Sequence, residues 1–162
     1  MNNGKGQSMP LAQAISERDP SAFIDLEQRL GEWTAEVAPE KIAQVCQWLK
    51  DEWQFERLST LTAVDWPERD PRFDVVYHLH SIARNERLRL KCRVGGDAPE
   101  IDSVVSVWSG ANWYEREVFD LFGIRFRNHP DLRRIMMPED WQGYPLRKDY
   151  PLHGGRYDYA GK

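Results

Sequence analysis

The residues best suited to chemistry are concentrated between positions 115 and 136, where four acids, five arginines and a histidine alternate with large apolar side chains. Acid–base catalysis by Glu115, Glu117 or Asp120 would need an adjacent nucleophile or cofactor motif, and the sequence has none beside them. The chain also lacks a G-x-G-x-x-G or Walker loop, so neither motif can provide a nucleotide site. The pattern favours a docking element over an active site.

The cysteines and histidines do not form a recognisable metal motif. Cys46 and Cys92 are far apart in sequence, and an iron–sulfur cluster needs about four thiolates. We expect both cysteines to be small buried hydrophobes. His78, His80 and His129 lack zinc-ligand spacing, which favours surface or turn roles. The expectation is no catalytic, cofactor-binding or metal site in this chain.

A helix must position the acids. It is predicted to begin near Asn112, with Glu115 three residues later as in a capping box, and to end at Gly123. On a helical wheel Glu115 lies in the apolar arc, so it needs a partner. It either caps its own helix or bridges to an arginine further along, such as Arg133 or Arg134, and both can hold. Arg116 and Asp120 are four residues apart and could pair on a solvated face.

After Gly123 the sequence has no sustained period over about 40 residues. Four prolines lie there, yet the segment is rich in Phe, Leu, Ile, Met, Trp and Tyr. Irregular loops longer than about 12–15 residues are unusual in a compact domain. A disordered tail would lack the apolar side chains. We therefore expect an extended arm that is ordered because it lies on another protein.

The rest of the chain predicts an α+β fold: a small, mostly antiparallel sheet with helices packed on one face, followed by that long extended C-terminal arm. A helix is expected from Asp19 to Gly31 and a second after Pro39. Residues 101–108 could form a strand or a short helix, and the short helix is favoured. Strands are expected at 32–37, 55–65, 73–82 and 88–94, with a hairpin loop at 83–86. The expected domains are a flexible N-terminus (1–18), an α+β domain (19–123) and a partner-binding arm (124–162).

Composition limits the function classes. The chain has 162 residues and a formal net charge of −4. It has no apolar run near the roughly 20 residues of a membrane helix, so no direct membrane insertion is expected. Residues 123–162 carry eight basic and five acidic groups, which suggests an anionic partner surface. A row of basic residues on one predicted strand could bind nucleic acid: Arg87, Arg89, Lys91 and Arg93. The overall acidic charge argues against that partner.

The order of residues from 115 onward forms a signature. It has Glu-Arg-Glu, an acid three residues on, two apolar residues, a six-residue gap, a histidine, and a basic residue before an aliphatic pair. These are Glu115, Arg116, Glu117, Asp120, Leu121, Phe122, His129, Arg133, Ile135 and Met136. This order resembles the 30 kDa subunit family of respiratory complex I. The similarity continues through residues 138–151.

The resemblance implies a non-catalytic structural or assembly subunit in the hydrophilic arm of a proton-translocating NADH:quinone oxidoreductase. It implies a peripheral position on the cytoplasmic side of the cell membrane. FMN, iron–sulfur clusters and quinone would lie in partner subunits, chiefly the large quinone-site subunit and neighbouring iron–sulfur subunits. The implied partner-binding or structural residues are Glu115, Arg116, Glu117, Asp120, His129, Arg133, Arg134, Trp141, Arg147, Lys148 and Asp149.

Two alternatives remain open on sequence alone. The chain could be the equivalent subunit of a membrane-bound nickel–iron hydrogenase or of a ferredoxin-driven relative, because the electron donor binds elsewhere. Neighbouring genes would decide between these. A free-standing nucleic-acid adapter that uses the arginine row belongs to another class, and an undetectable affinity for DNA or RNA would remove it.

Overall fold

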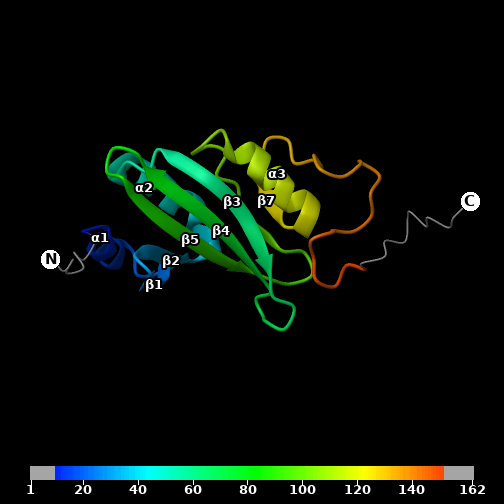
Figure 1. Ribbon diagram of the computed structural model, residues 1–162, viewed down its shortest axis with the longest axis horizontal. Coiled ribbons are helices and arrows are strands. Elements are labelled where there is room, and N and C mark those ends of the chain that lie inside the picture. Colours follow the sequence, from blue (N-terminus) through cyan, green and yellow to red (C-terminus); the bar gives the residue numbers. More distant parts are fainter. Residues whose placement is uncertain (1–9, 152–162) are drawn as a thin grey trace, which may run out of the picture.

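The computed structural model describes residues 10–151, and its centre is a five-stranded sheet in the order β1-β2-β5-β4-β3 (Figure 1). Neighbouring strands are antiparallel except β2 and β5, which are parallel. The strands are β1 Phe23–Arg29, β2 Glu32–Val37, β3 Arg57–Asp65, β4 Phe73–Ser81 and β5 Glu86–Val94. A separate parallel pair joins β6 Glu100–Asp102 to β7 Arg125–Arg127.

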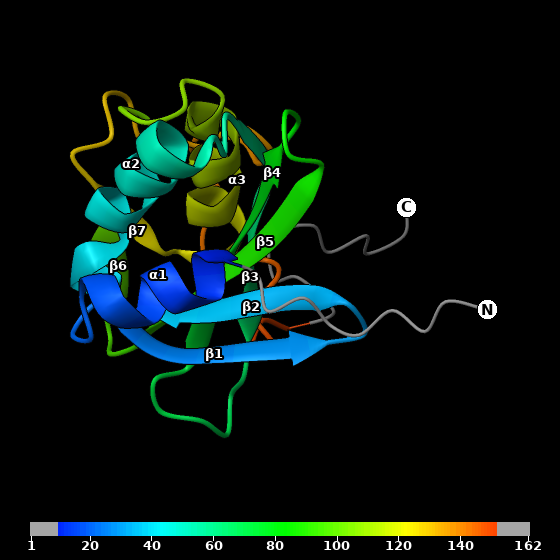
Figure 2. The same ribbon diagram turned by 90° about the vertical axis from the view of Figure 1, so that its left-hand side faces the viewer.

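Helices cover one face of this sheet and leave the other open (Figure 2). They are α1 Pro10–Arg18, α2 Ile42–Trp53 and α3 Ala111–Phe122, with a 3-10 turn at Pro39–Lys41 before α2. This confirms the expected α+β class, with a mixed but mostly antiparallel sheet. Within residues 10–151 no helix has the length and apolar character needed to cross a membrane.

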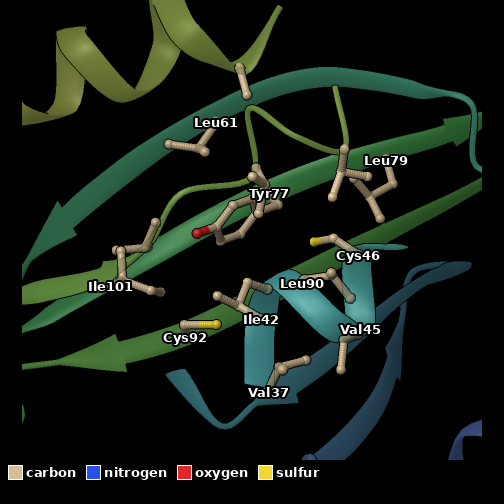
Figure 3. Packing of buried hydrophobic residues seen from close by; sticks show 14 of the residues in the cluster. Val37, Ile42, Val45, Cys46, Leu61, Tyr77, Leu79, Leu90, Cys92 and Ile101 are labelled. Atoms are coloured by element: carbon tan, nitrogen blue, oxygen red, sulfur yellow. The ribbon is translucent and has the colours of Figure 1, made fainter. Parts of the chain in front are cut away.

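The core lies between the helices and the sheet (Figure 3). Alternate residues of β4 and β5 point into it, as the period-two pattern predicts. From α2 the buried stripe is Ile42, Val45, Cys46 and Leu49, which confirms the predicted helix after Pro39. Cys46 and Cys92 are both free and buried, and burial raises the pKa of each thiol well above its ordinary value. Both cysteines therefore act as hydrophobes.

The N-terminal third differs from the sequence expectation. The predicted helix from Asp19 to Gly31 is wrong: Asp19 accepts hydrogen bonds from the Ser21 amide and hydroxyl in a turn, and β1 follows. Leu30 and Gly31 both have positive φ and form the two-residue turn of the β1–β2 hairpin. The helix lies earlier, at Pro10–Arg18, with Leu11 and Ile15 buried, so the later part of the stretch assigned to a flexible N-terminus is helical.

Residues 101–108 are also not a helix. Strand β6 ends at Asp102, and the Val107 and Trp108 amides both donate to the Val104 carbonyl in a tight turn. The strand partner of β6 is β7, which begins two residues after Gly123. Three-residue strands are too short to give a period, so neither was visible in the sequence.

Candidate functional site

Helix α3 begins and ends without side-chain caps. Its N-cap is Gly110, and it ends at Gly123, which adopts a left-handed conformation with φ of 76°. The predicted bounds of this helix are therefore confirmed. Residues 128–151, here called the C-terminal segment, form one irregular run beside α3 and the end of β3 (Figure 1).

The C-terminal segment is fastened to α3 at Asp120, which is fully buried. The Asp120 carboxylate accepts Arg134 Nη1 at 2.5 Å and the backbone amides of Ile135, Met136 and Met137 at 3.0, 2.7 and 2.9 Å. Arg134 also donates to the Asp120 and Gly143 carbonyls, both at 3.0 Å. We call Asp120, Arg134 and the amides of 135–137 the Asp120 cluster. It satisfies three backbone donors that lie outside any helix or strand.

Electrostatics agree with this geometry. Burial alone would raise the pKa of Asp120, but the Met137 amide, Arg134 and the other two amides outweigh it and hold that pKa below its usual value. The expectation that Asp120 pairs with Arg116 on a solvated face is wrong, because both residues are buried. Arg116 instead donates to the Arg133 and Arg134 carbonyls at 3.1 and 3.4 Å.

A second fastening lies at the C-terminal end of α3. The Leu146 amide donates to the Leu121 carbonyl at 3.0 Å, and Arg147 Nε donates to the Phe122 carbonyl at 2.6 Å. These are carbonyls that a helix end leaves without intrahelical donors. The C-terminal segment thus completes the hydrogen bonding of α3.

Tyr144 packs between these two fastenings. The guanidinium groups of Arg134 and Arg147 lie 5.4 and 4.8 Å from its ring centre. The ring also covers Gly123 so closely that a Cβ there would lie 2.5 Å from it. Gly123 is therefore needed twice, for its positive φ and for the approach of the ring.

A third fastening joins the C-terminal segment to the sheet. Asp65, at the end of β3, accepts Arg72 Nε and Nη2 at 2.6 and 2.7 Å and the Lys148 amide at 2.7 Å. Arg72 Nη1 reaches Asp149 at 2.9 Å. Sequence reasoning missed Asp65 and Arg72. The only sequence signal was an acid at the last, inward-facing position of an apolar strand.

Glu115 has neither of the roles considered from sequence. It does not cap α3 and does not reach Arg133 or Arg134; it is fully buried and accepts Ser103 Oγ at 2.6 Å and the Val104 amide at 2.7 Å. Burial raises the pKa of Glu115 to about 7, against the lowering effect of those two hydrogen bonds. Glu115 thus holds the turn after β6 against α3.

His129 links the start of the C-terminal segment to α3. Its Nδ1 accepts the Asp131 amide at 3.0 Å, so the proton of the neutral ring lies on Nε2, 3.4 Å from the Asn112 carbonyl. Burial lowers the pKa of His129, in keeping with a neutral ring. Its Nε2 is also 3.9 Å from a Glu115 oxygen. His129 therefore has the turn role expected for it, because its ring accepts the amide of a residue two positions later.

The other predicted residues are more exposed. Glu117 and Arg133 lie on the surface, and Arg133 pairs with exposed Asp131 at 2.9 Å. Trp141 is half-buried, and its amide donates to the Pro138 carbonyl. Of the eleven predicted residues, the contacts bring Asp120 together with Arg134, and Arg116 with the backbone of Arg133 and Arg134. The others lie on α3 or along the C-terminal segment.

The arrangement braces the fold through buried hydrogen bonds and ion pairs. Among residues 10–151 no three His, Cys, Asp or Glu side chains converge in a way that could hold a metal ion. The expected extended arm is not seen in the part that is described, where residues 128–151 form hydrogen bonds with their own domain. The last residues of that arm, 152–162, lie outside the described part.

The braced segment leaves apolar side chains outside. Trp113 and Met136 are each 61 % exposed. Trp113 stacks on Arg116, which bonds the carbonyls of residues 133 and 134, and the Met136 amide bonds Asp120. Both side chains therefore flank one stretch of the surface, which we call the Trp113 surface. Leu146, further along, is 49 % exposed.

Comparison with known proteins gives a consistent result. Residues 35–156 match the family described as respiratory-chain NADH dehydrogenase, 30 Kd subunit. The chain is 48 % identical over 150 residues to an NADH-quinone oxidoreductase subunit of Geobacter sulfurreducens, covering 91 % of this chain and 93 % of the relative. It is likewise 46 % identical over 157 residues to the counterpart of that subunit in Rhodobacter capsulatus, covering 94 % and 78 %.

Two solved structures are similar in fold. One is the trypsin-resistant fragment (1-134) of Nqo5, with a TM-score of 0.67 and 30 % identity over 76 % of this chain and all of that one. The other is a chain of the membrane-bound sulfane sulfur reductase, an archaeal respiratory membrane complex. Its TM-score is 0.77 at 27 % identity, covering 89 % of this chain and 85 % of that one.

Proposed function

The chain belongs to the 30 kDa subunit family of the respiratory-chain NADH dehydrogenase, and from this premise we propose that it works as a structural subunit rather than as a carrier of electrons. It is a subunit of NADH:quinone oxidoreductase, in the hydrophilic arm of that complex. Electrons from NADH would pass through FMN and iron–sulfur clusters to quinone in partner subunits. The complex would hold this chain peripherally on the cytoplasmic side of the cell membrane.

The observation that carries this proposal is the Asp120 cluster. It uses a buried carboxylate, a largely buried arginine and three backbone amides to fix a segment that has no secondary structure of its own. A single well-defined shape for an irregular segment is useful when that segment must fit another surface. No other chemistry is supported by the groups gathered there.

The proposed contact is the Trp113 surface. Large exposed apolar side chains that lie together mark protein interfaces, and tryptophan and arginine are frequent anchors in them. Trp113 and Met136 flank the braced stretch, and Arg133 in that stretch is also exposed. We propose that the large quinone-site subunit and neighbouring iron–sulfur subunits lie over this surface.

The test separates assembly from chemistry. A tagged chain with Trp113→Ser and Met136→Ser replaces the natural subunit, and the complex is isolated from membranes in mild detergent. We expect much less assembled complex, because the two anchors are lost while Asp120 stays in place. NADH oxidation by the separated input module, measured with an artificial acceptor, should be unchanged.

The control is Leu30→Ser, which removes a 96 % exposed apolar side chain from the β1–β2 turn, away from the proposed contact. It should assemble like the wild type. Full assembly of the Trp113→Ser, Met136→Ser variant with a selective loss of quinone-linked turnover would contradict the proposal, since it would place these residues in the chemistry.

A second candidate comes from the structural likeness to the sulfane sulfur reductase chain. It would make this chain the equivalent subunit of another membrane-bound respiratory complex, such as a hydrogenase or a ferredoxin-driven relative. The 48 % identity to an NADH-quinone oxidoreductase subunit favours NADH. A flavin- and nucleotide-binding subunit in the purified complex would support the first candidate, and hydrogenase maturation genes beside this one would support the second.

A further inference from the structure

The open face of the sheet carries a depression that none of the contacts above uses. It has a volume of about 430 Å³ and lies where β3 and β5 begin and β4 ends. Its residues on β4 and β5 alternate with the core-facing ones, so the depression lies on the side away from the helices. Strand register places its arginine and histidine side chains side by side: Arg57 opposite His80, His80 opposite Arg87, and His78 opposite Arg89. We call these five residues the arginine–histidine depression.

Charge within the depression is not balanced. Its one acid, Glu32, is paired with Arg89 at 2.8 Å. Within residues 10–151, neither Arg57 nor Arg87 has an ion-pair partner, and the Nε2 atom of His80 is buried without a hydrogen-bond partner. Arg57 and Arg87 lie on either side of His80 and present two guanidinium groups to the depression without an acid of their own. An anionic group placed in the depression could pair with both of them.

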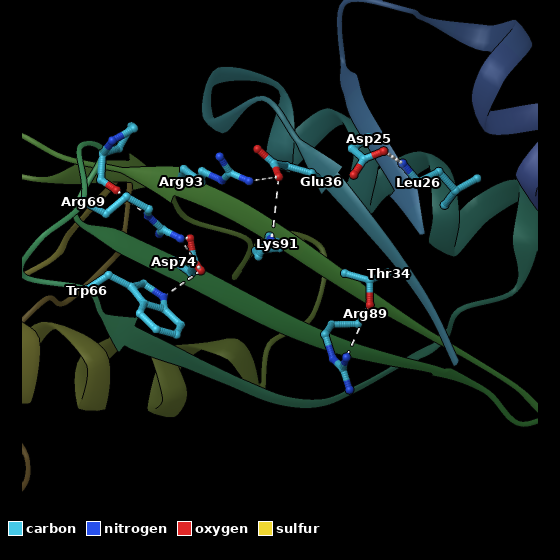
Figure 4. Close-up of polar contacts among 11 residues, drawn as sticks. Asp25, Leu26, Thr34, Glu36, Trp66, Arg69, Asp74, Arg89, Lys91 and Arg93 are labelled. Atoms are coloured by element: carbon cyan, nitrogen blue, oxygen red, sulfur yellow. Dashed lines mark hydrogen bonds and ion pairs between the residues drawn. The ribbon is translucent and has the colours of Figure 1, made fainter. Parts of the chain in front are cut away.

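In the other half of the same face the cations are paired with acids, which makes the contrast specific (Figure 4). There Arg93 and Lys91 both lie on Glu36, at 2.6 and 3.8 Å, and Asp74 accepts Arg69 and the Trp66 indole. Each of those cations faces an acid from an adjacent strand or turn. The excess positive charge is therefore a feature of one end of the face and not of the sheet as a whole.

We propose that an acidic polypeptide segment of a neighbouring subunit docks in the arginine–histidine depression and places two or more carboxylates against Arg57 and Arg87. This rests on the proposed function, because it requires a neighbour. Arginine favours such a partner through paired hydrogen bonds to a carboxylate. The net charge of −4 opposes a long polyanion such as nucleic acid, whereas a short acidic segment meets only the local charge.

The first test introduces lysine amines into the depression, which can be cross-linked to carboxylates, without changing its charge. The variants Arg57→Lys and Arg87→Lys keep the cation and add an amine that carbodiimide joins to a carboxylate in contact with it. In the assembled complex we expect an amide bond from position 57 or 87 to an Asp or Glu of another subunit, identified by mass spectrometry. Arg125→Lys, on exposed β7, is the control for non-specific coupling.

A second variant measures the attraction itself. Arg57→Glu with Arg87→Glu should lower the amount of that neighbour retained at moderate salt by about tenfold, since two attractions become repulsions. Arg125→Glu should have no such effect. An assembled complex with no cross-link from either lysine to another subunit, and no response to charge reversal, would overturn this proposal while leaving the proposed function intact.

The isolated chain gives a last discrimination. If inorganic phosphate shifts the NMR signals of His78 and His80 at low concentration and the assembled complex gives no cross-link, the depression is a small-anion site and the proposal is wrong. If DNA or RNA binds there in a salt-sensitive way with no cross-link, it is equally wrong. Failure of the wild-type chain to enter any complex would instead remove the proposed function.

Discussion

The C-terminal segment and the arginine–histidine depression both contain an arginine–carboxylate pair, but the two pairs differ in burial. In the Asp120 cluster the acid is fully buried and also receives three backbone amides. On the open face Arg89 and Glu32 keep 37 % and 54 % of their side-chain surface exposed. Losing one partner of a buried pair is costly, because the other charge stays buried without a counter-charge. Losing one partner of an exposed pair costs little, because water solvates the remaining charge.

The strongest test of this contrast is Asp120→Asn. Removing the charge leaves the largely buried Arg134 beside a neutral amide whose NH₂ group faces backbone donors, and breaking a buried pair costs about 3–5 kcal/mol. We expect a loss of that size in the free energy of unfolding, measured by urea denaturation. Asp131→Asn removes an acid from the exposed pair with Arg133 and is the matched control. Equal losses in the two variants would refute the distinction.

The next test uses pH at Glu115. Its pKa in the fold is about 7, raised by burial from an ordinary value of 4.5. Between these values the folded chain binds more protons than the unfolded chain, so this residue's contribution to stability is full below pH 4.5 and is lost as the pH rises through 7. Glu115→Gln imitates the protonated acid. The free energy of unfolding of the variant should therefore rise relative to that of the wild type from about pH 5 to 8, by at most about 3 kcal/mol.

Urea denaturation of both proteins at several pH values measures this difference. The lowered pKa of His129 acts in the opposite direction, but His129 is present in both proteins. Glu117→Gln, on the exposed side of the same helix, is the control for the substitution itself. If the difference in free energy of unfolding between Glu115→Gln and the wild type does not change with pH, Glu115 is already ionised at about pH 5.

Gly123→Ala tests whether the aromatic packing adds to the brace. A left-handed residue with a side chain costs about 1–2 kcal/mol, and here the Cβ would also meet the Tyr144 ring. Gly96 has a similar φ of 85° but open space around it, so Gly96→Ala carries the backbone cost alone. We expect the free energy of unfolding, measured by urea denaturation, to fall by about 1 kcal/mol more in Gly123→Ala than in Gly96→Ala. Identical losses would show that Tyr144 simply moves aside.

Elements with a regular hydrophobic period could be predicted from the sequence, whereas turns and side-chain contacts without a period could not. The alternation of β4 and β5 and the stripe of α2 were readable because many residues share one period. The β1–β2 hairpin was missed because its turn uses Leu30 in a left-handed conformation that leucine rarely adopts. At the site, the α3 acids were found but their partners were not. Asp120 bonds backbone amides, and any residue type except proline supplies an amide.

The smallest expected effect lies on the open face, at Glu32→Gln. The Arg89–Glu32 pair is exposed on both sides, so its loss should change the free energy of unfolding by less than about 1 kcal/mol. The same substitution removes the one acid that lines the arginine–histidine depression and frees Arg89. If that depression docks an acidic segment, Glu32→Gln should increase the salt resistance of the assembled complex, because another cation becomes available to the neighbour. Urea denaturation of the isolated chain and salt titration of the complex separate the two effects. A stability loss as large as that of Asp120→Asn would show that this pair belongs to the fold rather than to an interface.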